Sequence, residues 1–304
     1  MEKHNVTTIL LLGFPGLFSF RILFFLFVFM TYLTTVCGNF LVIMLVSSSR
    51  NLHSPMYFFL TQLTTSDIIT SSDIVPNMLH IVLSNGSFMS LPGCLTQLFF
   101  FGSSEASECL LLTVMSYDRY LAICHPLHYD SLMNLRLCLK YIFLSWFTGF
   151  TVTLVQTVNL SQLHFCHSNV IDHFFCDFDP VINLSCSTIN NIKLISIFMG
   201  FPIIVCPFII VVISYGYIVH AILKIRSITG RQKTFSTCGS HLTVVSIFYG
   251  TLFSIYLIPQ AGNSMVFIKI LSIVYTVVTP LVNPIIYSLR NEDFKKAFKK
   301  IKVC

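Results

Sequence analysis

Four carboxylates lie within long apolar stretches of this sequence, at Asp67, Asp73, Glu105 and Glu108. At the centre of a membrane helix each would cost roughly 2.5–3.5 kcal/mol, and four together would cost on the order of 10 kcal/mol. We therefore expect these side chains to face a bundle interior, water or a partner rather than lipid. A functional role and a satisfied structural role are both consistent with such a placement.

Three charged residues form a stripe along one expected helix. Glu108 and Arg119 are eleven residues apart, which is three helical turns, and Glu105 lies one turn before Glu108. The spacing places all three on one helical face. It predicts a central helix with polar groups from the middle of the membrane to its inner end.

Two other groups of polar residues are weaker candidates for a catalytic or metal site. Asp67 and Asp73 share one helix but lie six residues apart on different faces, so they are not the paired acids of an intramembrane enzyme. One loop could bind a soft metal through His164, Cys166, His167, His173 and Cys176. We favour disulfide use of its cysteines, because that loop is expected in an oxidising compartment.

The composition indicates which elements position these residues. Hydrophobic residues make up 55% of the 304 residues and charged residues only 10%, and the mean hydropathy is +0.80. A soluble domain needs more surface charge, so we expect one domain over 1–304, embedded in the lipid bilayer. The net charge of +6 would suggest nucleic acid in a soluble protein, but here no nucleic-acid partner is expected.

Seven apolar runs have the length of about 20 residues that a transmembrane helix needs. They cover residues 22–46, 56–80, 95–122, 139–159, 194–220, 237–259 and 267–289. The expected fold class is an all-α membrane protein, a seven-transmembrane helix bundle. Residues 291–302 place apolar and lysine side chains on opposite faces, which predicts a short amphipathic helix on the inner leaflet. A disordered basic tail is the alternative.

The distribution of positive charge gives an orientation. With the N-terminus outside, fourteen of the 18 Lys and Arg residues fall at inner helix ends and four fall outside, as the positive-inside rule expects. Asn5 begins a glycosylation sequon in the expected outer tail, and similar triplets begin at Asn85, Asn159 and Asn183. No cleavable signal peptide is expected, because the first apolar run is too long and starts too late.

Four of the eleven cysteines fall on the expected outer side, where disulfides form, namely Cys94, Cys166, Cys176 and Cys186. Four cysteines allow three pairings. We favour Cys94–Cys176, which would tie the third helix to the long loop at 160–192, together with Cys166–Cys186 inside that loop.

Several motifs occur in a fixed order along the chain. They read LHSPMYFFL at 52–60, MSYDRYLAICHPLHY at 115–129, KTFSTCGSHL at 233–242 and PLVNPIIYSLRN at 280–291. With Gly38-Asn39, Ser214-Tyr215 and an outer loop holding three cysteines, the chain resembles the odorant receptors, a subclass of the rhodopsin-like G-protein-coupled receptors. The resemblance covers nearly the whole chain. It implies a plasma-membrane receptor of sensory cilia that binds small volatile odorants and activates a stimulatory heterotrimeric G protein.

The resemblance also implies a switch at the inner helix ends. Arg119 would pair with Asp118 or swing to the G protein, although alone it could be a snorkelling residue that closes a helix. The expected helix at 237–259 lacks the Trp, and the acid at its start, that are usual in the receptor class. His241 in this helix could hydrogen-bond Arg119 or Tyr215 instead. The implied set is Asp118, Arg119, Tyr120, Tyr215, His241, Asn283, Pro284 and Tyr287.

Two cofactors can be considered. Asp67 resembles a buried acid of the receptor class that can hold sodium, and Glu108 could join it. Retinal is not expected, because its Schiff-base lysine would fall near Val277, whereas the nearest lysine, Lys269, lies at the outer edge. A transporter would show internal repeats and broken helix pairs, and the sequence contains neither.

The implied ligand pocket lies in the outer half of the bundle, between the expected helices at 95–122, 194–220, 237–259 and 267–289. Helical spacing from the motifs selects a mostly apolar set with a few hydroxyls, as suits a small volatile molecule. The set is Phe101, Gly102, Glu105, Ala106, Met199, Ile203, Tyr249, Leu252, Phe253, Tyr256, Ile273 and Thr276. Plain core packing is the alternative for some of these residues.

Glu105 has three interpretations. An ionised side chain could attract an amine, a protonated one could donate to a carbonyl or alcohol, and either could simply bond neighbouring helices. The acid of aminergic receptors would fall at Phe101 instead. The identity of the odorant stays open, and a non-olfactory rhodopsin-like receptor for another small ligand is the alternative function.

Overall fold

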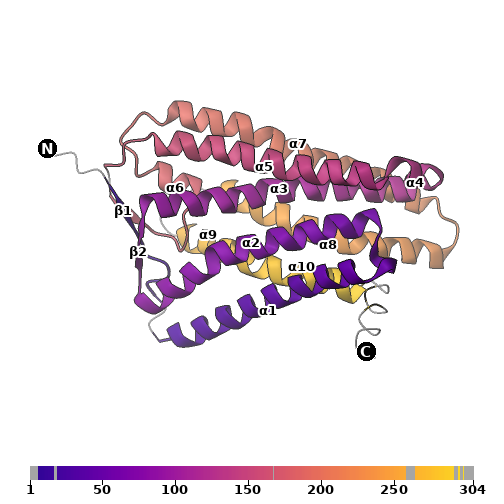
Figure 1. Cartoon of the computed structure of the whole chain (residues 1–304), viewed down its shortest axis with the longest axis horizontal. Helices are drawn as coiled ribbons and strands as arrows, with labels where there is room; N and C mark the ends of the chain where they lie inside the picture. The colour runs from indigo at the N-terminus through magenta and orange to yellow at the C-terminus, as the bar shows by residue number, and fades with distance from the viewer. Residues whose placement is uncertain are drawn as a thin grey trace.

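The computed structural model describes residues 6–16, 19–166, 168–257, 264–290, 294 and 297. Seven long helical segments run side by side along one axis (Figure 1). They are α1 (Arg21–Ser48), α2 (Pro55–Ser84), α3 (Leu91–Cys124), α5 (Leu135–Ser161), α7 (Asn190–Leu223), α8 (Ile228–Leu257) and a last segment formed by α9 (Ser264–Ile273), η3 (Val274–Val278) and α10 (Thr279–Arg290). The chain is therefore the expected all-α seven-helix bundle. Each segment begins before its apolar run, because helical hydrogen bonding continues past the hydrocarbon layer.

Six of these segments have the length and hydropathy of a membrane-spanning helix, α2 being the remaining one. Helix α2 is as long as the others, but it carries two aspartates and a row of Ser and Thr residues. Much of this polar face is buried, including Thr64, Ser66, Asp67 and Ser71. The polarity of α2 is therefore turned into the bundle and not toward lipid.

Helix α3 is the central helix. Of its most apolar stretch 61% is buried, against 17% for α7 and 22% for α5. Small residues allow this central position, since a Cβ on Gly149 of α5 would lie 2.8 Å from the backbone oxygen of Ser103 on α3. Close approach of backbones at small residues is a common way for membrane helices to associate.

Local sequence explains where several helices begin and end. The hydroxyl of Ser90 accepts from the amide of Gly93 at the start of α3, and the side chain of Asn134 accepts from the amide of Leu137 at the start of α5. Pro55 occupies the first turn of α2, where a missing N–H costs nothing. Asn85 ends α2 in the left-handed conformation, with φ of 58°, which asparagine tolerates better than most residues.

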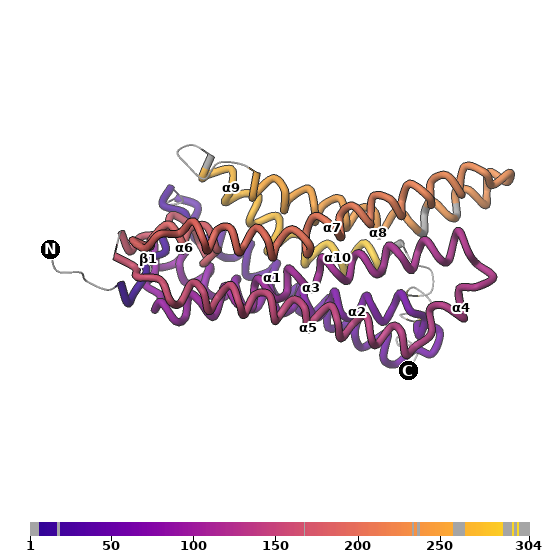
Figure 2. Tube along the Cα trace, turned by 90° about the horizontal axis from the view of Figure 1, so that it is seen from above, coloured from indigo at the N-terminus to yellow at the C-terminus, as the bar shows by residue number. Residues whose placement is uncertain are grey.

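A small sheet covers the outer end of the bundle. Strand β1 (Thr8–Leu11) pairs antiparallel with β2 (Ser87–Ser90) and parallel with β3 (Val170–Ile171). The sheet and α6 (Phe178–Ile182) lie at one end of the molecule, and α4 (Tyr129–Leu132) lies at the other, where it contacts η2 (Pro126–His128). The short turn η1 (Arg50–Leu52) joins α1 to α2. Figure 2 shows the same separation from a second direction. No pattern in the sequence predicted this sheet.

The last transmembrane segment is irregular above its proline. Helix α10 continues through Pro284 to Arg290, whereas the wide π-helical turn is η3, about two to three turns before Pro284. Asn39 Nδ2 of α1 donates to the carbonyl oxygen of Pro280 at 2.9 Å, and this bond links α1 to the last transmembrane segment. Beyond α10, Phe294 and Ala297 are helical and buried, and the Phe294 ring lies edge-on to Tyr57. The rest of the expected amphipathic helix lies outside the described residues.

Candidate functional site

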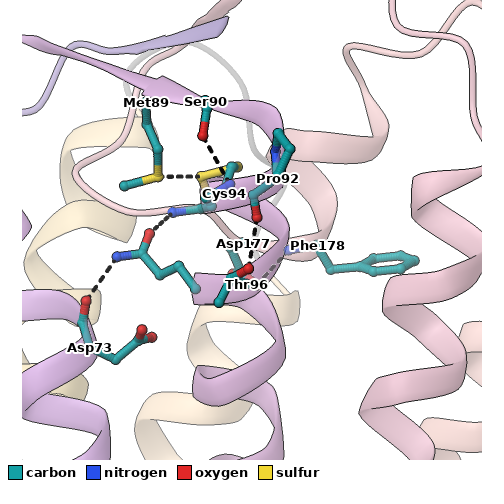
Figure 3. Close-up of a disulfide and its surroundings, with 11 residues drawn as sticks. Asp73, Met89, Ser90, Pro92, Cys94, Thr96, Asp177 and Phe178 are labelled. Atoms are coloured by element: carbon teal, nitrogen blue, oxygen red, sulfur yellow. Dashed lines mark hydrogen bonds between the residues drawn. A yellow bond between two sulfur atoms is a disulfide. The ribbon is translucent and has the colours of Figure 1, made fainter. Parts of the chain in front are cut away.

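Two disulfides fix the outer loop, and they join the pairs favoured by the sequence. Cys94 at the start of α3 is bonded to Cys176, and Cys166 is bonded to Cys186. Gln97 supports the first bond, because its side-chain oxygen accepts from the amide of Cys176 at 2.9 Å and its nitrogen donates to the carbonyl of Asp73 at 3.0 Å. Figure 3 shows these contacts, with the ring of Phe178 pointing away from the disulfide.

Lys269 of α9 joins the last transmembrane segment to the N-terminal segment and to the outer loop. We define the outer cap as strands β1–β3 with the loop at 164–186. The Lys269 ammonium group donates to the carbonyl of Gly13 at 2.8 Å and to the carboxylate of Asp172 at 2.5 Å. Next to Asp172, His173 is 3% exposed and lies against the rings of Phe174 and Phe175. Burial and the nearby Lys269 charge lower the pKa of His173 to about 3, so this imidazole is neutral at physiological pH.

Inside the cap, a cavity of about 180 Å³ lies between α3, α5 and α7. Its wall is apolar with a few polar side chains, and comprises Gly102, Glu105, Ala106, Val152, Thr153, Gln156, Phe178, Ser196, Gly200, Ile203, Ile204 and Tyr256. Helix α6 contributes Phe178 and helix α8 contributes Tyr256. We call this space the outer cavity.

The structure brings five of the twelve expected ligand residues together around the outer cavity. These five are Gly102, Glu105, Ala106, Ile203 and Tyr256. The remaining seven do not line it, and they occupy three other environments.

Two of the seven, Tyr249 and Phe253, line a separate groove between α7 and α8. Phe101 is buried against Phe175 and Tyr275. Thr276 is also buried, and its hydroxyl donates to the carbonyl of Ser272. Leu252 is buried in the core, and Met199 and Ile273 are half-buried away from the cavity.

Glu105 is the acid of the cavity wall. It is 9% exposed, and among the described residues no donor lies within hydrogen-bonding distance of its carboxylate. The negative charges of Asp177 and Glu108 both act on it. A buried carboxylate without a partner is costly, so the arrangement leaves Glu105 able to receive a donor from the cavity.

Asp177 lies at the end of the outer loop, beside the cavity wall. Its carboxylate accepts from the amide of Phe178 at 2.7 Å and from the hydroxyl of Tyr256 at 3.4 Å. Burial raises the pKa of Asp177 to about 6, the Phe178 amide lowers it, and the neighbouring Asp179 raises it further. Tyr256 therefore connects the cap to α8 at the cavity.

The inner end of α3 holds a closed ion pair. Arg119 Nε donates to the carboxylate of Asp118 at 2.9 Å, and a second guanidinium nitrogen contacts the same oxygen. The hydroxyl of Tyr129 donates to the other Asp118 oxygen at 2.7 Å. Asp118 is fully buried and Arg119 is 13% exposed, so Arg119 is held locally in this structure.

The other expected switch residues lie near this pair. Tyr215 of α7 and His241 of α8 are joined by a 2.6 Å hydrogen bond between the hydroxyl and Nδ1, which is one of the two partners considered for His241. Tyr120 is bonded to His125 at 3.1 Å. Tyr287 is buried, and its hydroxyl has no hydrogen-bond partner among the described residues.

A polar cluster lies in the middle of the bundle. Asn283 Nδ2 donates to both oxygens of Asp67, each at 3.1 Å. The charge of Glu108 acts on Asp67, and within the described part of the chain Glu108 Oε1 has no hydrogen-bond partner. No group of three or more His, Cys, Asp or Glu side chains that could hold a metal occurs among the described residues.

One wall of the outer cavity was not predicted from the sequence, and one predicted site lies outside the described residues. Helix α5 contributes Val152, Thr153 and Gln156, and the loop contributes Phe178. The amide of Gln156 within an apolar run was a signal for the first, whereas nothing local marks Phe178. Asn5, the expected glycosylation site, lies outside the described residues.

Comparison with known proteins gives one consistent family. The family model described as olfactory receptor matches residues 27–303. The chain is 44% identical to Olfactory receptor 6B2 of Homo sapiens, covering 99% of this chain and 97% of that protein. It is also 44% identical to Olfactory receptor 1468 of Rattus norvegicus over the full length of both, and 42% identical to Olfactory receptor-like protein I9 of the same species, covering 99% and 97%.

Proposed function

Because this chain belongs to the olfactory receptor family, and so is a multi-pass membrane receptor and not an enzyme, we propose that its outer cavity binds small volatile odorants. The observation that carries this proposal is a mostly apolar cavity next to the central helix, with the buried carboxyl group of Glu105 on its wall and no described residue donating to it. Its volume of about 180 Å³ lies below the roughly 300–1,000 Å³ of sites for drug-sized ligands. A small organic molecule suits that size.

Helix α3 connects the cavity to the inner surface. Glu105 lies on the cavity wall and Arg119 lies at the inner end of the same helix. A ligand shifts a two-state equilibrium only by its differential affinity for the two states. The odorant would bind better to a packing in which α8 moves outward at its inner end, breaking the Tyr215–His241 bond and freeing Arg119 from Asp118.

The proposed partner at the inner surface is the stimulatory G protein of olfactory neurons. The ion pair of Arg119 with Asp118 supports this role, because a local partner keeps the guanidinium from a protein surface until the packing changes. Tyr120 and Tyr287 lie at the same end, and Asn283 and Pro284 lie one turn above Tyr287. Receptor activation would be read as nucleotide exchange on that G protein.

The proposed location is the plasma membrane of sensory cilia, with the N-terminal side outside. Both disulfides lie at the end of the bundle that carries β1, and disulfides persist on the oxidising side of a membrane. The inner end carries most of the Lys and Arg residues. Glycosylation at Asn5 belongs to the same proposal.

A sodium ion is proposed near Asp67, without retinal or any other cofactor. The oxygens of Asp67 and the unpartnered Glu108 Oε1 are hard ligands of the kind that alkali and alkaline-earth cations prefer. The test is the melting temperature of the purified receptor in sodium against choline chloride. A sodium-specific rise that Asp67→Asn removes is expected, and equal melting temperatures in the two salts would contradict it.

The proposed function is tested by a cyclic-AMP screen of transfected cells against a broad odorant panel. We expect at least one odorant to raise cyclic AMP, and Arg119→Ala to remove that response at equal surface expression. Silence toward every odorant class despite surface expression would contradict the proposal. A response only to non-odorant small ligands would favour the alternative receptor function.

A further inference from the structure

The wall of the outer cavity carries a buried carboxyl group, that of Glu105, to which no described residue supplies a donor or a counter-charge. Glu105 is more than nine-tenths buried, it lines the cavity, and no described residue donates a hydrogen bond to it. Asp177 adds a second negative charge that acts on Glu105 from the cap. Leaving a buried carboxylate unpaired is expensive, so the cavity favours an occupant that brings its own positive charge.

None of the described Lys or Arg side chains lines the cavity. The charge of Lys193, in the first turn of α7, acts on Asp179. Lys269, at the outer end, is bonded to Asp172 and Gly13, and Arg119 is paired with Asp118 at the inner end of α3. A counter-charge that keeps Glu105 ionised would therefore come from outside the described part of the protein, for which a cationic ligand is the candidate.

The rest of the wall matches the two ends of a small amine. Gln156, Thr153 and Ser196 offer side-chain oxygens that accept hydrogen bonds, and an ammonium group has three donors to place. The rings of Phe178 and Tyr256 can face a cation. Apolar side chains from α3, α5 and α7, among them Ala106, Val152 and Ile203, complete the wall and would surround a short hydrocarbon body.

We propose that the ligands of this receptor are small primary amines, bound as ammonium ions to Glu105. The inference rests on the proposed function and names the ligand class of the same cavity. An alcohol of equal shape can also hydrogen-bond to the carboxylate, but only an ammonium adds the missing positive charge to the bond, so that both partners are ionised. The acid lies one helical turn deeper than Phe101 on α3.

The test compares molecules of matched shape on the full-length receptor in cells at neutral pH. The probes are butylamine, cyclohexylamine and benzylamine, each with its alcohol and hydrocarbon counterpart, and the readout is the half-maximal concentration for cyclic AMP. We expect at least one amine to be more potent than its alcohol and its hydrocarbon. This comparison uses the unmodified chain and needs no variant.

Two variants identify the residue responsible. Glu105→Gln should raise the half-maximal concentration of the amine by roughly 30-fold or more, with a much smaller change for the alcohol, whereas Glu105→Asp should lie between the two. The matched control is Asp73→Asn, which removes an acid of α2 that does not line the cavity and should leave amine potency unchanged. Surface labelling verifies equal expression of each variant.

Different outcomes overturn different claims. Alcohols or hydrocarbons that act where every amine is silent would overturn the amine inference and leave the odorant-receptor function in place. Unchanged amine potency in a well-expressed Glu105→Gln variant would also overturn it, because another group would then bind the amine. No response to these probes or to any odorant in the broad panel would overturn the proposed function as well.

Discussion

At the scale of single residues, burial decides the charge of His173. Its pKa of about 3 arises from burial and the Lys269 charge, whereas an unfolded histidine titrates near 6.5. Between these values the opened chain binds a proton that the folded cap does not. The stability contributed by neutral His173 is therefore present above pH 6.5 and is lost as the pH falls toward 3.

This gives the first prediction, for His173→Phe. Lowering the pH from 6.5 to 5 should weaken hydrogen-exchange protection of residues 170–176 less in the variant than in the parent. The difference should reach at most about 2 kcal/mol, because other groups titrate in both proteins. His164→Phe, at an exposed position of the same loop, should keep the parent pH dependence, and equal slopes in all three proteins would contradict the prediction.

Asp177 changes the stability of the cap with pH in the opposite direction to His173. Its pKa is raised to about 6, so the folded cap binds a proton between roughly pH 4 and 6 that the opened chain does not. The contribution of Asp177 to stability is therefore lost as the pH rises through 6. The two groups oppose each other over this range, which is why the His173 prediction compares slopes between proteins and not the absolute pH profile.

At the scale of elements, the contact between α3 and α5 depends on Gly149. A Cβ at this position would lie 2.3 Å from Ser107 Oγ and 2.8 Å from the carbonyl oxygen of Ser103. The hydroxyl could move, but the backbone oxygen requires the helices to separate. Helix α3 carries Arg119 and part of the cavity wall, so its packing against α5 affects both sites.

The second prediction compares two glycines. Gly149→Ala should lower stability by about 1–3 kcal/mol through overpacking. Gly216→Ala, where no atom lies within 4 Å of the added Cβ, should be neutral or stabilising by up to about 1 kcal/mol, because alanine favours a helix. Thermal inactivation of the purified receptor measures both, and a Gly149→Ala variant as stable as Gly216→Ala would contradict this account of the contact.

A third prediction concerns the bond between α7 and α8. Tyr215 and His241 are joined at 2.6 Å in the arrangement that holds Arg119 on Asp118. His241→Ala removes about 1 kcal/mol of net stabilisation from this arrangement, which corresponds to a roughly fivefold shift of the equilibrium. Basal cyclic AMP should therefore rise at equal surface expression. His220→Ala, at an exposed position in the last turn of α7, should leave basal signalling unchanged, and the same level in both variants would refute the proposed role of the bond.

At the scale of the whole molecule, one ion pair connects the N-terminal segment, the outer loop and the last transmembrane segment. The two partners differ in exposure, since the Lys269 side chain is 8% exposed and that of Asp172 is 47% exposed. Removing Asp172 leaves a buried cation with only the Gly13 carbonyl, whereas removing Lys269 leaves a carboxylate that water can solvate. Breaking a pair costs most when the remaining charge is buried.

The fourth prediction follows from this asymmetry. Asp172→Asn should destabilise the receptor by about 2 kcal/mol, and Lys269→Met by about 1 kcal/mol. The double variant should cost less than the sum of the two single variants, because it leaves no unpaired charge. Thermal inactivation of the three variants measures this, and Lys269→Met as the more harmful single change would contradict the argument.

The sequence by itself determined the membrane class and the seven helices, and among three possible cysteine pairings it favoured the one that the structure shows. Apolar runs of about 20 residues have few alternatives in a bilayer, because each backbone group must be satisfied within its own segment. The stripe from Glu105 to Arg119 likewise followed from helical spacing alone. Pairing the cysteines needed only the outer side of the membrane and the preference for tying the third helix to the loop.

Only the tertiary structure decided which residues share the outer cavity and what covers it. The strand pairing of Thr8–Leu11 with Ser87–Ser90 and Val170–Ile171 joins segments far apart in the chain, and no local pattern encodes such a partnership. Thr153 and Gln156 reach the cavity because small residues allow α5 to approach α3 closely. Spacing places a side chain on one face of its own helix, but the neighbour that meets this face is set by packing between helices. That packing gives Glu105 no hydrogen-bond partner among the described residues, which is the basis of the proposed ligand contact.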